Sequence, residues 1–139
     1  MEADTQQFFD RFAEKLLFGA PGDLATFYEP RSLYVRPDGS ESFVDRTEIS
    51  ALAATHQLHY RGIGAAHVSA EVLEHHGFAA TLTLVDVNLQ FSTAANTPVE
   101  DTVSTFVLRA CENAQRIVVH IPRQDCGYQF ALHSLALQD

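Results

Sequence analysis

Apolar residues in the first half of the chain recur at the spacing of an α-helix. Between residues 8 and 17 they fall every three or four positions, directly after the capping pattern Asp4-Thr5-Gln6-Gln7. This predicts a helix that begins at the capping pattern and ends at Gly19. Asp23 is typical of the start of a short second helix, which Pro30 would end.

A third helix is predicted after Asp45-Arg46-Thr47-Glu48, which is another capping pattern. The helix places one stripe of side chains on a single face: Ile49, Leu52, Ala53, His56 and Tyr60. Because most of this stripe is apolar, we expect it to pack on the rest of the protein. His56 and Tyr60 are then expected to point inward.

The pattern changes from helices to strands after Gly64. A short strand at residues 32–36 precedes the third helix, and two long hairpins follow it, turning at Gly77 and at residues 112–115. The long strands are predicted at residues 66–76, 78–91, 99–111 and 116–123, and residues 128–137 form either a last strand or an irregular tail. Helices followed by antiparallel strands indicate an α+β fold in one domain, residues 1–139, with helices on one face of a curved sheet.

The composition restricts the partners. The 139 residues are 46% hydrophobic and carry a formal net charge of −9. No basic stripe is available to neutralise phosphates, so we expect neither nucleic acid nor an anionic membrane as a partner. No apolar run approaches the roughly eighteen residues that span a bilayer, and the acidic N-terminus is unlike a signal peptide. Cys111 and Cys126 leave a disulfide open, but reduced thiols in a cytoplasmic protein are the simpler interpretation.

The segment LTLVDVNLQF, residues 82–91, combines an apolar strand face with a face that turns polar halfway along. Asp86, Asn88 and Gln90 share the polar half, because alternate residues of a strand face the same side. Either this half emerges into solvent, or it enters a pocket. Inside a pocket, partial burial would raise the pKa of Asp86 toward that of a useful general base.

Several short segments resemble a known superfamily. They are Phe27-Tyr28-Glu29-Pro30, Leu33-Tyr34-Val35, Arg46-Thr47-Glu48-Ile49 and the strand Gln115-Arg116-Ile117-Val118-Val119-His120. With the order of elements, they resemble the NTF2-like superfamily, which includes SnoaL-like proteins and ketosteroid isomerases. The resemblance implies a cone-shaped barrel, in which a strongly bent antiparallel sheet wraps around three N-terminal helices and leaves a pocket for an apolar small molecule.

The same resemblance implies a homodimer that forms through the outer face of the sheet. In such a dimer the apolar face of the strand, Val85, Val87, Leu89 and Phe91, would be buried on the convex side. Asp86 and Asn88 would then turn inward. We therefore expect Asp86 to face the pocket.

Ketosteroid isomerases offer a direct comparison of residues. They carry a catalytic Asp before the Pro of a D-P-x-G-S-E-P stretch, and a second, protonated Asp two residues before a Phe in a later strand. The matching positions here are Arg36, ahead of Pro37, and Ser104, ahead of Phe106. A guanidinium cannot abstract a proton near neutral pH. We therefore do not expect isomerase chemistry by the residues of that family.

The candidate catalytic residues are Asp86 as the base, with His56 or Tyr60 as the proton donor or oxyanion partner. The candidate ligand-binding residues are Asn88, Tyr34, Arg36, His120 and His59. Of these, Arg36 would pair with a surface carboxylate or, if inward, hold an anionic ligand group, whereas His120 could lie on either face of its strand. The spacing of His56 and His59 is compatible with metal ligation, but no closed ligand set accompanies them, so we expect no dedicated metal site.

Two functions from different classes remain open. One is a small SnoaL-like enzyme that acts on an apolar, carbonyl-containing molecule by acid–base chemistry without a cofactor, as an isomerase, cyclase or dehydratase would. The other is a non-catalytic module that binds a small ligand in the same pocket, or a dimeric scaffold. The position of Asp86 separates them, because an outward Asp86 leaves the enzyme hypothesis without its base.

Overall fold

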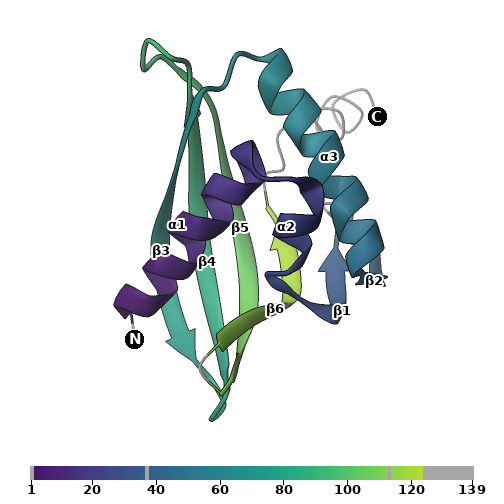
Figure 1. Cartoon of the computed structure of the whole chain (residues 1–139). Coiled ribbons are helices and arrows are strands. Elements are labelled where there is room, and N and C mark those ends of the chain that lie inside the picture. Colours follow the sequence, from purple (N-terminus) through teal and green to yellow (C-terminus); the bar gives the residue numbers. More distant parts are fainter. Residues whose placement is uncertain (1, 37, 113, 124–139) are drawn as a thin grey trace.

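The computed structural model describes residues 2–36, 38–112 and 114–123, which contain three helices and six strands (Figure 1). Two of the strands precede the third helix, and the other four follow it. The elements are α1 (Glu2–Phe18), α2 (Pro21–Ala25), β1 (Tyr28–Val35), β2 (Glu41–Asp45), α3 (Arg46–Gly62), β3 (His67–Gly77), β4 (Leu82–Ser92), β5 (Pro98–Cys111) and β6 (Ala114–Pro122). The α+β fold class is thus confirmed. The predicted strand or tail at residues 128–137 and Cys126 lie outside the described residues.

The six strands form one sheet in the order β2-β1-β6-β5-β4-β3. Strands β3 to β6 follow one another as antiparallel neighbours, whereas β1 runs parallel to β6. The sheet is therefore mixed, with β2 and β3 at its edges, instead of antiparallel throughout. Figure 1 shows the three helices on one side of this sheet, with α1 crossing the long strands and α3 lying beside β1 and β2.

The core lies between the helices and the inner face of the sheet. Phe9 and Phe12 of α1 contact Phe106 of β5, with ring centroids 4.8 and 5.6 Å apart. Tyr60 of α3 stacks on Phe91 of β4 at 4.0 Å. The apolar face of β4 consequently packs under the helices, and its members Val85, Val87, Leu89 and Phe91 are all buried within the chain.

The start of α3 is as predicted. Asp45 accepts a hydrogen bond from the Glu48 amide at 2.9 Å, and the Glu48 carboxylate accepts one from the Asp45 amide at 3.2 Å. The start of α1 differs from the prediction, because the helix begins at Glu2 and already includes Asp4.

The region around Pro30 also differs from the prediction. Helix α2 ends at Ala25, and Pro30 lies inside β1, where it does not terminate a helix. The pairing of β1 with β6 is irregular between Tyr28 and Leu33, which is the stretch that contains Pro30. A residue without an amide hydrogen is tolerated in a strand at such an irregularity.

Candidate functional site

A small cavity lies between α3 and the inner face of the sheet. Its walls include His56 and Tyr60 from α3, Ser104 from β5 and His120 from β6, and its volume is about 40 Å³. That is room for a few water molecules and well below the roughly 150 Å³ of an engineered cavity that binds benzene. In its present shape the cavity therefore suits a molecule of a few heavy atoms.

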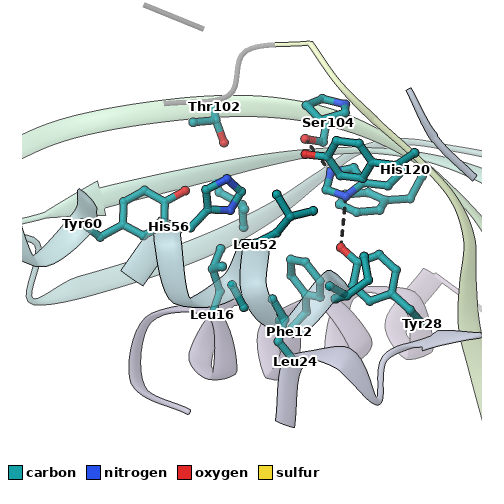
Figure 2. A pocket seen from close by; sticks show the side chains of 16 residues that line it. Phe12, Leu16, Leu24, Tyr28, Leu52, His56, Tyr60, Thr102, Ser104 and His120 are labelled. Carbon is teal, nitrogen blue, oxygen red and sulfur yellow. Dashed lines mark hydrogen bonds between the residues drawn. The ribbon is translucent and has the colours of Figure 1, made fainter. Parts of the chain in front are cut away.

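A chain of hydrogen-bonding groups crosses one end of the cavity (Figure 2). The Tyr28 hydroxyl lies 3.0 Å from His120 Nδ1, and Ser104 Oγ lies 3.3 Å from His120 Nε2. All three residues are buried. Because one ring nitrogen of a neutral imidazole donates and the other accepts, a change of tautomer reverses the direction of both hydrogen bonds.

The reversible chain gives Ser104 two chemical roles. When His120 Nε2 donates to Ser104 Oγ, the Ser104 hydrogen is available to a carbonyl oxygen in the cavity. When Ser104 donates to Nε2 instead, its oxygen can accept a hydrogen bond from a ligand hydroxyl. The cavity can therefore hold a ligand oxygen in either its carbonyl or its hydroxyl form.

The surroundings of His120 fix its ring in place. The imidazole stacks on Phe106 with centroids 4.3 Å apart and meets the Tyr34 ring edge-on at 5.0 Å. The pairing of β5 with β6 shifts register between Val107 and Leu108. This shift lets both Ile117 and His120 be buried, although strict alternation along β6 would place them on opposite faces.

Helix α3 supplies the opposite wall. His56 and Tyr60 both line the cavity, and their ring centroids are 6.3 Å apart. In Figure 2 both side chains extend from α3 toward Thr102 on the sheet. The predicted inward direction of His56 and Tyr60 is therefore confirmed, and their predicted catalytic roles stay predictions.

The expected direction of Asp86 is wrong. Leu89 lines the cavity and the alternate residues of β4 pack under the helices, so Asp86 lies on the outer face of the sheet. There its carboxylate pairs with Arg123 and accepts a hydrogen bond from Thr105. The apolar side chains of β4 from Val85 to Phe91 pack under the helices, so they do not form the convex dimer interface that the resemblance implied.

The pKa of Asp86 reflects this outer-face setting. Partial burial opposes ionisation, but the hydrogen bonds from Arg123 and Thr105 and the charge of Arg123 outweigh it, so the pKa lies below its ordinary value. A general base needs a raised pKa near the working pH. Asp86 therefore has neither the position nor the proton affinity for the predicted role.

Three other candidates lie away from the cavity wall. Asn88 shares the outer face of β4 with Asp86, so its expected inward direction is also wrong. Arg36 donates to the Ser42 hydroxyl at 3.0 Å beyond the end of β1. His59 lies on α3 but pairs with Glu100 at 3.1 Å, outside the residues that line the cavity. Tyr34 and His120, in contrast, both line the cavity.

Sequence reasoning missed Tyr28 and Thr102, which line the cavity, and gave Ser104 no role. The signal for Ser104 was its match to the position of an isomerase acid, and the alternation Glu100, Thr102, Ser104 marks one polar row along β5. Tyr28 carried no signal of its own, because it was expected in a helix.

The described part of the cavity wall contains no Asp, Glu, Lys or Arg. Within residues 2–36, 38–112 and 114–123, no group of three or more His, Cys, Asp or Glu side chains could hold a metal ion. Nor is any helix in these ranges long and apolar enough to cross a membrane. The polar chemistry of the cavity therefore rests on hydroxyl and imidazole groups.

Helices over one face of a six-stranded mixed sheet, with a cavity between them, define the NTF2-like class of α+β folds. A family model described as "NTF2-like protein (DUF6841)" matches residues 2–125, and the chain belongs to this family. The resemblance inferred from short segments is thereby confirmed. No curated protein matches the sequence significantly.

Solved structures share this fold at low sequence identity. A domain of unknown function with a cystatin-like fold from Nostoc punctiforme has a TM-score of 0.67 and 17% identity over 98% of this chain and 85% of that one. Aln2 from a Streptomyces species has a TM-score of 0.66 and 12% identity over 97% of this chain and 96% of that one. A hypothetical protein with a ketosteroid isomerase-like fold from Catenulispora acidiphila, in complex with trimethylamine, has a TM-score of 0.54 and 15% identity over 89% of each chain.

Proposed function

We propose that this protein binds a small, mainly apolar molecule with one carbonyl or hydroxyl oxygen in the cavity between α3 and the sheet. The observation that carries the proposal is the buried chain Tyr28–His120–Ser104 at one end of an otherwise apolar wall. Apolar walls with a few convergent polar groups are typical of small-molecule sites. Ser104 holds the ligand oxygen, and His120 and Tyr28 set the direction of its hydrogen bond.

The size of the cavity limits the ligand. Drug-sized ligands occupy about 300–1,000 Å³, whereas this cavity measures about 40 Å³. A ligand of about four heavy atoms is the class that this volume admits, and the trimethylamine held by the Catenulispora protein is of that size. A ring of the size of cyclopentanone enters only when Leu52 moves, because that side chain lines the cavity and is only partly buried.

A second function is cofactor-free enolisation of a bound ketone, and the placement of His56 favours it. His56 lies on the wall opposite the Ser104–His120 pair (Figure 2). In this reaction His56 takes a proton from the carbon next to the carbonyl, while Ser104 donates to the oxygen that becomes negative. Return of the proton to the carbon regenerates the ketone and its transfer to the oxygen gives the enol, so the step balances without any further reactant.

One probe tests both functions. Cyclopentanone carries the carbonyl, and cyclopentane has nearly the same shape without it. We expect cyclopentanone to shift the amide resonances of Ser104 and His120 in an NMR titration and to bind more tightly than cyclopentane. Ser104→Ala should weaken cyclopentanone binding roughly threefold to tenfold, the range expected for one neutral hydrogen bond.

The matched control is Ser69→Ala, which makes the same chemical change at an exposed position on β3. It should leave cyclopentanone binding unchanged. Equal binding by wild type and Ser104→Ala would contradict the proposed contact. Exchange of the α-hydrogens of cyclopentanone for deuterium in wild type, and its loss in His56→Gln, would support the enolisation function. Binding without exchange would support a binding function alone.

A further inference from the structure

Glu100 places a buried carboxylate at the other end of the polar row on β5. Its side chain is only 7% exposed, and His59 Nε2 contacts Oε1 at 3.1 Å. The second oxygen, Oε2, is fully buried and has no hydrogen-bond partner among the described residues. A carboxylate has about four acceptor sites, so one partner leaves this group poorly satisfied.

Such an arrangement lowers the stability of the folded protein when no ligand is bound. A buried charge or polar atom without a partner destabilises a protein unless it is paired or hydrogen-bonded. A buried acceptor without a donor in a native protein therefore needs an explanation. A ligand that donates a hydrogen bond to this acceptor is one explanation. His59 supplies a single N–H, which leaves Oε2 for a second donor.

An open groove meets Glu100 at this end of the sheet. It has a volume of about 680 Å³, and its walls include Glu100, Asp101, Gln90, Phe91 and Val99. It shares no described lining residue with the cavity between α3 and the sheet. Its described walls carry two carboxylates and neither Lys nor Arg. The electrostatic potential therefore favours a cation, and the net charge of −9 strengthens that preference.

We propose that this groove binds a small organic ammonium ion, whose N–H donates to Glu100 Oε2 and whose alkyl part lies on Val99 and Phe91. An ammonium supplies both the charge and the hydrogen bond that Oε2 lacks. A divalent metal fits less well, because the described residues offer no group of three metal-ligating side chains. The site is separate from the cavity, so its test does not depend on the outcome of the test of the proposed function.

The test uses n-butylammonium chloride as the probe and n-butanol as its uncharged counterpart of equal length. In NMR titrations of the whole chain, we expect butylammonium to shift the amides of Val99, Glu100 and Asp101 and to leave those of Ser104 and His120 unchanged. Butanol should bind much more weakly. Loss of one charged hydrogen bond predicts about tenfold to hundredfold weaker butylammonium binding in Glu100→Gln.

Glu71→Gln is the matched control, because it removes the same charge from an exposed position on β3 of the same sheet. It should bind butylammonium like wild type. A general attraction of cations to an acidic protein would weaken binding equally in both variants and would overturn the proposal. His59→Gln keeps a donor for Oε1 and is expected to retain binding.

Two further results would also overturn the proposal. One is the absence of shifts at residues 99–101 in wild type, a readout that does not depend on whether Glu100→Gln folds. The other is a response of these amides to Zn²⁺ alone, which would make the pair a metal site instead. Cyclopentanone shifts at Ser104 in the same sample would show that the cavity functions whatever happens at the groove.

Discussion

At the scale of single residues, the site depends on which side of a strand each polar group faces. Alternation correctly grouped Asp86 with Asn88, but it did not say which group faces the helices. The physical criterion was available in the sequence, because the opposite face of β4 is apolar at four successive positions from Val85 to Phe91. A face that packs on the core is typically apolar in this way. Asp86 therefore belongs to the solvent side, where Arg123 pairs with it.

His120 shows what the sequence could not reveal at this scale. Its face depends on a register shift between β5 and β6, and no residue pattern marks that shift. The partners of His120 come from β1 and β5, about 90 and 16 residues earlier in the chain. Contacts between such distant segments follow from the strand order, which includes an unusual parallel pair that local periodicity does not predict.

The Asp86–Arg123 pair makes a residue-scale prediction about acid stability. The pKa of Asp86 in the folded protein lies below its ordinary value of 3.8, so ionised Asp86 stabilises the fold above that pH. This contribution is lost as the pH falls from 3.8 through the folded-state pKa. We expect Asp86→Asn to lower the free energy of unfolding by up to about 1 kcal/mol at pH 7, since Arg123 is half exposed.

Urea denaturation at a series of pH values would check this. The difference between wild type and Asp86→Asn should shrink as the pH falls below 3.8 and approach zero in strong acid. A difference that is constant from neutral pH into strong acid would contradict the assignment. Cyclopentanone binding should be the same in both proteins, because Asp86 lies on the outer face of the sheet.

At the scale of elements, the helices were more predictable than their connections. The capping pattern at Asp45 placed the start of α3 correctly, because its two hydrogen bonds form within four residues. Strand β2 at Glu41–Asp45 was not predicted, and β1 is longer than expected. Strand β1 is hydrogen-bonded to β2 and to β6, and β2 is hydrogen-bonded to β1. The extent of both strands therefore depends on tertiary pairing more than on local preference.

Gln57 connects two of these elements and gives the element-scale prediction. It is buried on α3, and its Nε2 donates at 2.6 Å to the Gly19 carbonyl just past the end of α1. Gln57→Leu keeps the volume but removes this donor. We expect the free energy of unfolding to fall by about 1–3 kcal/mol, the cost of leaving a buried carbonyl without its partner.

The measurement is urea denaturation with an unchanged m-value. Leu58→Gln is a suitable control, because it alters the next residue of the same helix at a position that is 69% exposed. It should change stability by no more than about 0.5 kcal/mol. Equal effects of the two substitutions would contradict the role given to the Gln57–Gly19 hydrogen bond.

At the scale of the whole molecule, the fold class and the family followed from element order, whereas the site required the three-dimensional arrangement. The homodimer through the outer sheet face stays a prediction, and its basis has changed. Val85, Val87, Leu89 and Phe91 cannot supply its apolar contacts, because these side chains are buried within one chain. The outer face instead offers partly buried Val103 beside Asn88, whose Oδ1 is buried without a partner among the described residues.

A second chain on this face would supply a donor for Asn88 and cover Val103. We expect wild type to sediment as a dimer and Val103→Glu to sediment as a monomer, because the new carboxylate would be buried without a partner. Leu73→Glu is the matched control, because it adds the same charge at an exposed residue of the edge strand β3, and this variant should stay dimeric. Its neighbour Val72 is unsuitable, because that side chain packs against the core. A monomeric wild type at high concentration would exclude the dimer.

The proposed function requires that the cavity between α3 and the sheet is a ligand site whose polar contact is Ser104. A crystal structure of the protein soaked with cyclopentanone tests it most directly. We expect the ketone in the cavity, with its oxygen about 2.7–3.0 Å from Ser104 Oγ and its ring against Leu52 and Phe106. A cavity without the ketone at a saturating concentration, or a ketone oxygen turned away from Ser104, would contradict it.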